Sequence, residues 1–249
     1  MADLEGLVQK LFLPGAVYTF VGAGGKSTAM RQVAKILARG GLRPRMTTTT
    51  RIGIEEFSNF PVVFAASAGE LTEACGGREA VRLIVSATLA RQGKYLGIDS
   101  ALLEEIEISD DSVLLVEGDG SRRKPLKVPM DREPVIPARS ALVFALMGAA
   151  GFGEPIDEEH CYNHQAACGI VPSGSRSFDA ASLAAIAAHP AGCRKGVLPG
   201  MGFHVLMNQG DLADKRGIGD AALAILATRG IDTSLVSLQQ GVVYETSRL

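Results

Sequence analysis

A short glycine-rich segment carries a lysine and two hydroxyl side chains directly after an apolar run. The run is Val17–Val21, and the stretch that follows, Ser27–Arg39, has its apolar residues at helical spacing. Glycines let a backbone turn its N–H groups toward an anion, and a helix start adds partial positive charge. We therefore predict a phosphate loop for a nucleoside triphosphate, ATP or GTP. Its predicted nucleotide-binding residues are Gly22, Ala23, Gly24, Gly25, Lys26, Ser27 and Thr28.

Two side chains of this loop have predicted roles in phosphoryl chemistry. Lys26 is expected to contact the β- and γ-phosphates as a catalytic residue, and the Ser27 hydroxyl to bind Mg²⁺. The motif is the compact form GxxGK followed by Ser or Thr, because Phe20 stands where the longer form has glycine. Mur-type ligases use a similar compact loop ahead of their first helix. The alternative is a glycine-rich turn that carries Lys-Ser by chance, which the order of strand, glycines, lysine and helix disfavours.

Two acidic residues follow the clearest buried strand of the sequence. Val113–Val116 leads into Glu117 and Asp119, which lie two positions apart and therefore face the same side of an extended chain. Open α/β sheets bind their ligands at the carboxyl ends of the strands. We predict that both carboxylates are catalytic and hold Mg²⁺ or orient the attacking nucleophile. A solvated acidic turn is the alternative.

A threonine run ends the second predicted strand, Arg45–Ile52. Hydroxyl groups at this edge would contact Mg²⁺ or phosphate, with Thr48 as the predicted metal ligand, and Arg51 would stabilise charge during phosphoryl transfer. Threonine is also a common strand residue, so an ordinary β-strand explains the run equally well.

A basic segment, Arg122–Lys127, follows the acids at once and begins a loop that extends to Pro137. Its cations would bind a phosphorylated or carboxylated substrate, or the nucleotide itself. A solvated basic loop explains the run equally well. The prolines of Glu133–Pro137 keep the end of this loop extended.

A polar segment, Asn208–Asp211, follows the predicted strand Phe203–Met207. GTPases carry a similar Asn-x-x-Asp after a strand, where the two side chains contact the nucleotide base. We therefore predict that Asn208 and Asp211 bind the nucleotide, although both are also ordinary turn residues at strand ends. Gln209 stands where guanine-binding proteins have lysine, which leaves ATP and GTP both open.

Imidazole and thiol side chains recur every four residues at His160, His164 and Cys168, with Cys161 alongside. On the predicted helix Glu158–Ile170 this spacing would place them on one face, where they suit zinc or a similar metal. A partly buried helix that uses cysteine as a small apolar residue explains the same spacing. We favour that second interpretation, because no separate ligand pair occurs elsewhere in the sequence.

Strands and helices alternate along the chain, which predicts an α/β fold. We expect a mostly parallel sheet with helices on both faces, in the three-layer arrangement of P-loop NTPases. No repeat or composition break divides the chain, so we expect one domain over residues 1–249. The remaining predicted strands are Pro61–Ala65, Ala141–Met147 and Leu235–Leu238, and the remaining predicted helices are Arg78–Arg91, Ser100–Ile108, Asp179–Ala188 and Gly219–Thr228.

Composition narrows the class of protein. The net charge is −2 and no large basic field is present, so nucleic acid is not an expected partner. The four cysteines include no CxxC pair, which indicates reduced thiols rather than a disulfide framework. We expect a soluble cytoplasmic protein that does not enter the membrane. The start of the chain lacks signal-peptide features, and Ala141–Phe152 is too short to span a bilayer.

The order of these motifs resembles the YqeC family, whose members are accessory proteins of selenium-dependent molybdenum hydroxylases. The resemblance rests on the phosphate loop, the threonine run, Glu117–Ser121, the basic loop with Glu133–Pro137, and Asn208–Asp211. It implies a role in making or inserting the selenium-containing molybdenum cofactor, with a molybdenum hydroxylase or its cofactor as partner. The sequence departs from the family pattern at Met147–Ile156, which has no acid before Gly151.

The sequence supports one function and leaves two alternatives open. The first is binding of ATP or GTP with Mg²⁺, and hydrolysis that drives maturation of a selenium-dependent molybdenum hydroxylase. The second is an ATP-dependent kinase or Mur-like ligase that acts on a small anionic substrate held by the basic loop. The third is a non-catalytic, nucleotide-gated chaperone for a hydroxylase apoenzyme.

Overall fold

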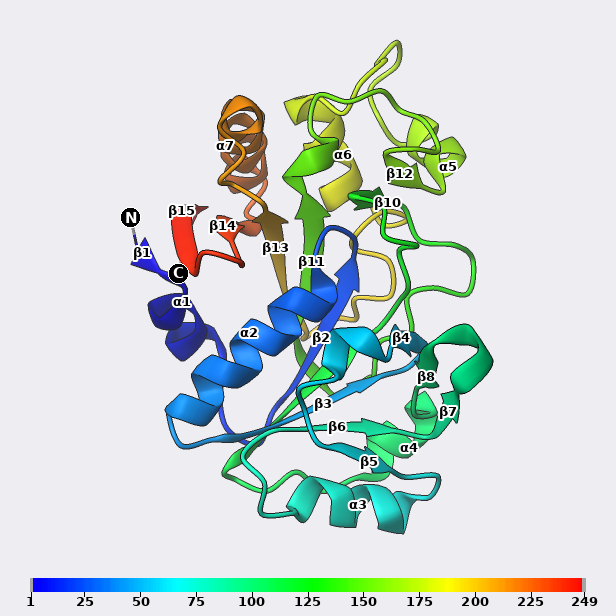
Figure 1. The fold of residues 1–249 in the computed structure, drawn as a ribbon. Coiled ribbons are helices and arrows are strands. Elements are labelled where there is room, and N and C mark those ends of the chain that lie inside the picture. Colours follow the sequence, from blue (N-terminus) through cyan, green and yellow to red (C-terminus); the bar gives the residue numbers. More distant parts are fainter. Residues whose placement is uncertain (1, 248–249) are drawn as a thin grey trace.

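A ten-stranded sheet forms the centre of the computed structural model, which describes residues 2–247 of the chain (Figure 1). The strands from β14 to β5 are all parallel, and the antiparallel β15 extends the β14 edge, with β1 beside it. In order across the sheet, the strands are β1 (Ala2–Asp3), β15 (Val242–Ser247), β14 (Asp232–Ser237), β13 (Gly202–Asn208), β11 (Ser140–Gly148), β2 (Val17–Gly22), β9 (Ser112–Glu117), β3 (Arg43–Thr48), β6 (Arg82–Val85) and β5 (Val62–Phe64).

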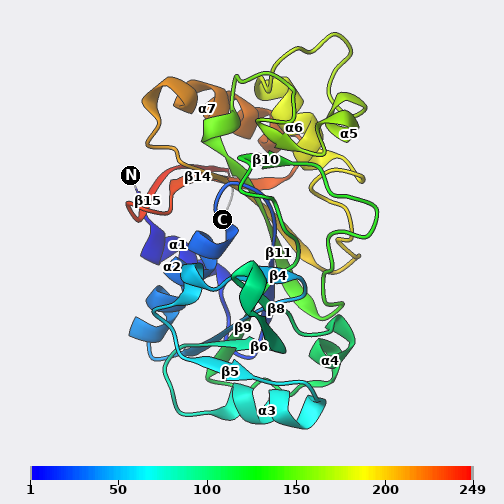
Figure 2. The same ribbon diagram turned by 45° about the vertical axis from the view of Figure 1, so that its right-hand side comes forward.

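Helices cover both faces of this sheet (Figures 1 and 2). The side chains of β2 show why, because Tyr18 and Phe20 are buried with the helices of one face, whereas Val17 and Val21 are buried with those of the other. The predicted α/β class, with a mostly parallel sheet and three layers, is therefore confirmed. The first face carries α1 (Leu4–Leu11) and α2 (Lys26–Arg39), and the second carries α6 (Ala180–Ala188), α7 (Ala213–Thr228), α3 (Ala68–Gly76) and α4 (Ser100–Glu105).

The path of the chain reverses direction across the sheet at β2. From β2 the chain builds β3, β5 and β6 on one side, returns to β9 beside β2, and continues to β11 and β13 on the other side. Parallel sheets open a crevice at the carboxyl ends of the strands where such a reversal occurs, and ligands bind there. The fold therefore places its expected binding crevice at the ends of β2, β9, β11 and β13.

Several short elements surround this crevice. β4 (Arg51–Gly53), β8 (Lys94–Leu96) and β7 (Ala87–Leu89) form a three-stranded antiparallel sheet, and β10 (Leu126–Lys127) pairs with β12 (Cys161–Tyr162). The other short elements are α5 (His164–Cys168) and the 3-10 helices η1 (Glu55–Phe57), η2 (Ala90–Gln92) and η3 (Ala149–Gly151). Within residues 2–247, no helix is both long enough and apolar enough to pass through a membrane.

The predicted helix Arg78–Arg91 is wrong. Its centre forms the strand β6, followed by β7 and η2. Leu83, Ile84 and Val85 are all fully buried, so the segment has apolar contacts on both faces, as a strand inside a parallel sheet does. A short apolar run of this kind has no periodicity that separates a buried strand from a helix.

The predicted helix Glu158–Ile170 is also wrong, except for its five-residue segment α5. Asp157 Oδ1 accepts hydrogen bonds from the N–H groups of Glu159 and His160, a turn that competes with helix formation. Cys161–Tyr162 then pairs as β12, and Asn163 has a left-handed φ of 64°. These residues therefore lack the common helical face that their spacing predicts.

The predicted strand Arg45–Ile52 is divided into two strands in different sheets. β3 ends at Thr48, whose hydroxyl accepts a hydrogen bond from the Thr50 N–H at 3.1 Å. Such a local side-chain bond turns the backbone away from the sheet ladder. The chain resumes at Arg51 as β4, in the three-stranded sheet.

Candidate functional site

Five parallel strands end at the edge of the sheet that carries the predicted site residues. Glu117, at the end of β9, is in register with Phe20 of β2 and with Thr48 of β3. On the other side of β2, the end of β11 pairs with Asn208 of β13 through Gly148. Segments that are far apart in the sequence therefore meet around the phosphate loop.

Glycines allow the loop between β2 and α2 to lie directly against β11. Gly22 and Gly24 have positive φ values of 89° and 83°. A Cβ on Gly22 would lie 2.4 Å from the Leu146 carbonyl oxygen, and one on Gly24 would lie 2.3 Å from the Gly148 Cα. Both the backbone conformation and the close packing therefore require glycine at these two positions.

Backbone N–H groups at the start of α2 are free to bind a ligand. Within residues 2–247, these groups have no hydrogen-bond acceptor from Gly24 through Thr28, whereas the preceding Ala23 N–H bonds the Leu146 carbonyl at 2.9 Å. A helix cannot satisfy its own first N–H groups, and the N-cap residue Gly25 has no side chain to do so. All five residues line one cavity. This is the arrangement that binds phosphate at helix N-termini.

Lys26 is buried inside the loop. Its Nζ donates to the Gly22 carbonyl at 2.6 Å and lies 3.3 Å from Asp119 Oδ1. Burial lowers the pKa of the Lys26 ammonium, but the negative charges of Asp119 and Glu117 outweigh burial, so its pKa lies above the ordinary value. Lys26 therefore carries a positive charge at the centre of the loop.

Asp119 connects the phosphate loop to the basic loop. It is fully buried, and both of its carboxylate oxygens accept the Gly22 N–H at 3.1 Å. Lys127 Nζ lies 2.9 Å from Asp119 Oδ2 and 2.7 Å from Glu133 Oε2. With Lys26, these residues form a cluster of two cations and two carboxylates in which only Glu133 is partly exposed, and such compensation is what makes buried charges tolerable. Asp119 thus anchors the loop from behind.

The side chain of Glu117, the last residue of β9, contacts the first turn of α2. Its Oε2 accepts a hydrogen bond from the Ser27 hydroxyl at 3.0 Å. Burial raises the pKa of the Glu117 carboxyl to about 7, although the Lys26 charge and the Ser27 hydrogen bond oppose this rise. The site therefore joins a hydroxyl and a carboxyl group that titrates near neutral pH.

Thr48 and Arg51, the two predicted site residues of the threonine segment, occupy different positions relative to the cavity. Thr48 is fully buried, and its hydroxyl donates to the Glu117 carbonyl oxygen at 2.9 Å, which places it behind the site. Its neighbours Thr49 and Thr50 line the cavity instead. Arg51 also lines the cavity, is exposed, and lies 3.4 Å from Gln92 Oε1 through its Nη1.

Asn208 connects three parts of the site edge. Its side-chain amide donates to the Gly24 carbonyl at 2.8 Å, and its Oδ1 accepts the Leu238 N–H at 3.0 Å. The amide group is thus bonded to the phosphate loop and to the segment after β14. Asp211 is exposed and lines the same cavity.

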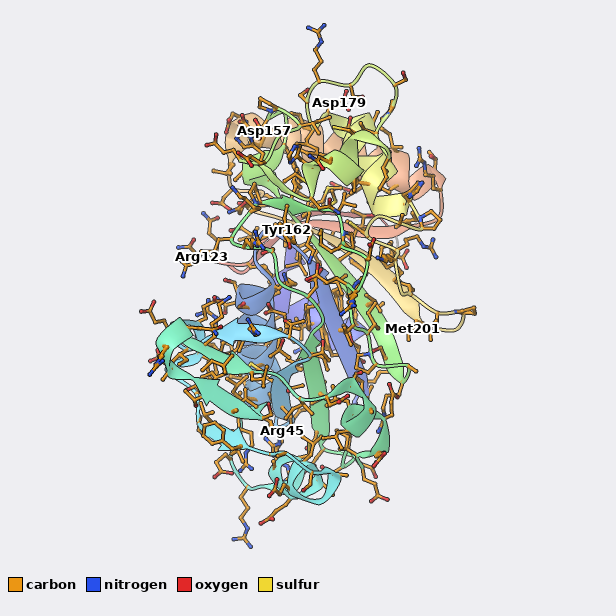
Figure 3. All side chains as sticks on the ribbon, turned by 90° about the vertical axis from the view of Figure 1, so that its right-hand side faces the viewer. Arg45, Arg123, Asp157, Tyr162, Asp179 and Met201 are labelled. Atoms are coloured by element: carbon orange, nitrogen blue, oxygen red, sulfur yellow. The ribbon has the colours of Figure 1, made fainter. Side chains whose placement is uncertain are left out.

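The cations of the basic loop lie in two different places, one in the buried ion cluster and three in the cavity wall. Lys127 is buried in the ion cluster, whereas Arg122, Arg123 and Lys124 line the cavity. The Arg122 guanidinium carbon lies 5.0 Å from the centroid of the Tyr162 ring, within the range of a cation–π contact. Figure 3 shows Arg123 and Tyr162 on the same flank of the molecule, between the α5–α7 end and the rest of the sheet.

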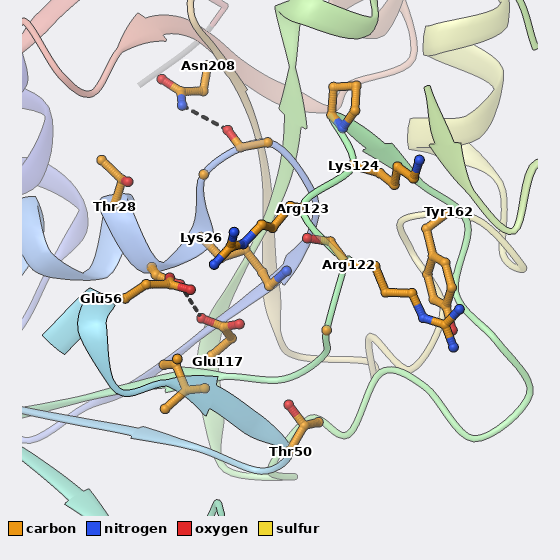
Figure 4. A pocket seen from close by; sticks show the side chains of 18 of the residues that line it. Lys26, Thr28, Thr50, Glu56, Glu117, Arg122, Arg123, Lys124, Tyr162 and Asn208 are labelled. Carbon is orange, nitrogen blue, oxygen red and sulfur yellow. Dashed lines mark hydrogen bonds between the residues drawn. The ribbon is translucent and has the colours of Figure 1, made fainter. Parts of the chain in front are cut away.

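These parts surround one cavity of about 1270 Å³, seen from close by in Figure 4. Four of the predicted site residues do not line it and lie behind its wall: Gly22, Ala23, Thr48 and Asp119. The predicted site residues that do line it are Gly24, Gly25, Lys26, Ser27, Thr28, Arg51, Glu117, Asn208 and Asp211.

The histidine and cysteine residues lie away from this cavity. His160 Nδ1 is 2.8 Å from Asp157 Oδ1, and burial raises the pKa of the Cys161 thiol to about 12. In the described part of the chain, no group of three or more His, Cys, Asp or Glu side chains is arranged to hold a metal ion.

Sequence reasoning missed several cavity residues. Glu56, Lys94 and Tyr162 line the cavity, although they belong to short elements whose position depends on tertiary pairing. Arg31 was open to prediction, because it follows Ser27 by one helical turn. Its guanidinium donates to the Ser27 and Glu56 carbonyl oxygens, at 3.2 and 2.9 Å, and so attaches η1 to α2.

Comparison with known proteins places the chain in a family. The family described as YqeC protein matches residues 18–165, which include the phosphate loop, both acids and the basic loop but not Asn208. The uncharacterised protein YqeC of Escherichia coli (strain K12) is 31% identical over 188 residues, which are 74% of this chain and 72% of that protein. The chain therefore belongs to the YqeC family.

Proposed function

We propose that this protein binds a magnesium nucleoside triphosphate on the loop Gly22–Thr28 and transfers its terminal phosphoryl group. The observation that carries the proposal is the set of N–H groups from Gly24 to Thr28, which have no acceptor among residues 2–247. They belong to residues that line the cavity, including the positively charged Lys26. A triphosphate offers the oxygen acceptors that these donors lack, and its charge complements the start of the helix. Water is the simplest acceptor of the phosphoryl group.

Mg²⁺ fits the oxygen donors that the cavity offers. Ser27 Oγ and Glu117 Oε2 are 3.0 Å apart and belong to residues that line it, and both are hard oxygen ligands. Mg²⁺ commonly uses one or two protein ligands together with phosphate oxygens and water, so it needs no larger protein cage. When bound, the cation offsets phosphate charge. Asp119 then serves as the anchor of the loop, and Glu117 completes the metal site.

The base specificity stays open between ATP and GTP in this proposal. Because the Asn208 amide is bonded to backbone groups, Asp211 is the better placed of the pair to contact a base. The same cavity is also lined by Leu212, Ser237 and Gln239, which offer apolar and polar surface suited to a heterocycle.

Family membership supports a cellular role for this chemistry. We propose that nucleotide turnover serves the making or insertion of the selenium-containing cofactor of a molybdenum hydroxylase, the role with which the YqeC family is associated. A phosphoryl-transfer step would supply the driving force for assembly of a cofactor with an easily lost ligand.

The test is isothermal titration of the protein with ATP and GTP, each with and without Mg²⁺. We expect Lys26→Ala to abolish binding, because it removes the only cation inside the loop. Lys26 is buried, so circular dichroism must show that the variant folds, and Ser27→Ala provides a milder second variant that should weaken the Mg²⁺ dependence. A folded Lys26→Ala protein with unchanged nucleotide affinity would overturn the proposal.

A further inference from the structure

The cavity has two walls of different composition (Figure 4). One wall is the phosphate loop with the ends of β13 and β14, where the nucleotide of the proposed function would lie. The second wall is formed by β4 and β8 of the three-stranded sheet and by the turn Ser121–Pro125. The volume of about 1270 Å³ exceeds the roughly 300–1,000 Å³ of ordinary small-molecule sites. The cavity therefore has room for a second ligand beside the nucleotide.

The second wall carries cations without acidic partners. Among residues 2–247, none of its five basic side chains forms an ion pair, whereas Lys127 of the same loop is paired twice. The protein as a whole has a net charge of −2, so this clustering is local. Like charges on one wall repel one another, and an anionic ligand would offset that repulsion. The five residues are Arg51, Lys94, Arg122, Arg123 and Lys124.

The backbone of the turn is held in a conformation that arginine rarely adopts. Arg122 and Arg123 have φ values of 50° and 62°. Such conformations persist at functional sites when the surrounding structure fixes them. Here the Lys124 N–H donates to the Ser121 carbonyl at 3.0 Å, and the buried Lys127 fixes the chain that follows. Figure 4 shows the result, in which Arg122 lies along the Tyr162 ring while Arg123 extends toward Lys26.

We propose that the turn Arg122–Lys124, together with Arg51 and Lys94, forms a subsite for the phosphate or carboxylate group of a small second substrate. The inference rests on the proposed nucleotide site, because Arg123 extends from this wall toward the loop that would hold the terminal phosphate. Guanidinium groups present forked donors that match both anions, and the lysines add point charges. The subsite would thus hold an anionic acceptor next to the phosphoryl group.

The test uses inorganic phosphate and malonate as probes of the two anion classes. Each is titrated onto protein already saturated with Mg²⁺ and a non-hydrolysable ATP analogue, so that the phosphate loop is occupied. We expect one probe to bind with a stoichiometry of about one, and the double variant Arg123→Ala/Lys124→Ala to weaken it at least about tenfold. Binding of phosphate alone indicates a phosphorylated substrate, and binding of malonate alone indicates a carboxylate.

Arg132→Ala is the matched control, because Arg132 is an exposed arginine of the same loop that does not line the cavity. It should leave probe binding unchanged. Equal weakening by the control, or no probe binding to the wild type, would overturn the subsite. A larger loss of analogue affinity than of probe affinity in the double variant would assign these cations to the nucleotide instead. If the wild type fails to bind the analogue at all, the proposed function itself fails.

Discussion

Lys26 and Glu117 show how neighbouring charges set the chemistry of single residues in this site. Both side chains are buried, yet Lys26 keeps its charge because it lies close to Asp119 and Glu117. For Glu117, burial outweighs the opposing Lys26 charge, and the pKa of the carboxyl rises to about 7. A carboxyl group that titrates near neutrality binds a cation in competition with protons.

This competition predicts that Mg²⁺ affinity depends on pH through Glu117. Below pH 7 the carboxyl is largely protonated, so the apparent affinity for Mg²⁺ in the presence of nucleotide should rise between pH 6 and 8. Glu117→Gln should lower that affinity and flatten its pH dependence. The measurement is Mg²⁺ titration of the nucleotide complex at several pH values, and a wild-type slope in Glu117→Gln would contradict the assignment.

The same pKa shift has a consequence for stability. Because the folded-state pKa of Glu117 lies above its ordinary value of 4.5, the folded protein retains this proton where the unfolded chain has lost it. Stability should therefore fall as pH rises from about 4.5 to 7, by about 3 kcal/mol at most. Glu117→Gln should remove this component. Asp119→Asn, in contrast, should lower stability at all these pH values and should leave the Mg²⁺ affinity pH-dependent, since Asp119 lies behind the cavity and Glu117 is retained.

The strand–turn–helix unit of Val17–Arg39 is where the predicted and the observed elements agree most closely. Its strand, glycines and helix follow one another without a gap, so local chemistry alone predicts the turn. The ends of β9 and β13 were predicted as well, because buried apolar runs precede polar residues there. Elements whose identity depends on tertiary pairing were not predicted correctly from the sequence. β6 reads equally as a helix, and β12 exists only because Cys161–Tyr162 meets Leu126–Lys127.

Two further elements, α1 and β15, were not predicted, and they differ in whether the sequence could have revealed them. α1 has an Asp3 N-cap whose carboxylate accepts the Gly6 N–H at 2.7 Å, a local pattern that was open to prediction. β15, however, lies antiparallel between β14 and the two-residue β1, and its pairing with β14 defines it. The basic wall of the cavity likewise combines β4 and β8 from two stretches of the chain, so sequence alone cannot place Lys94 near Arg51.

For the loop Gly22–Thr28 as an element, we predict that Gly24→Ala abolishes nucleotide binding. A Cβ at this position would lie 2.3 Å from both the Cα and the N of Gly148, so the loop must move away from β11 and its N–H groups must lose their common direction. Gly41→Ala is the matched control. Its φ of 87° is as unfavourable for alanine as the 83° of Gly24, but nothing lies within 4 Å.

The measurement is nucleotide titration together with thermal unfolding of both variants. Gly41→Ala should lose stability through its backbone conformation, by about 1 kcal/mol, and keep its nucleotide affinity. Gly24→Ala should lose both. If the two variants bind nucleotide equally well, the close approach of the loop to β11 has no part in binding.

For the whole molecule, the two walls of the cavity connect the structure to the proposed cellular role. The cavity lies where the sheet reverses direction, and its basic wall belongs to elements inserted around β3 and β9. The family match over residues 18–165 includes both the loop and that wall, so the two features occur together in the matched region. An enzyme with the proposed anionic second substrate would use both the loop and this wall.

This reasoning leads to a prediction in the cell. Deletion of the gene should impair a selenium-dependent molybdenum hydroxylase and spare a molybdenum enzyme whose cofactor carries sulfur, because the proposed step acts on the selenium-containing cofactor alone. The experiment assays both enzymes in one deletion strain and restores the strain with wild-type, Lys26→Ala or Arg123→Ala/Lys124→Ala protein. Wild-type protein alone should restore activity, since one variant lacks nucleotide binding and the other lacks the anion subsite. Equal loss of both enzymes would indicate general cofactor synthesis, and loss of neither would refute the role. Full restoration by Lys26→Ala would separate the cellular role from the nucleotide site.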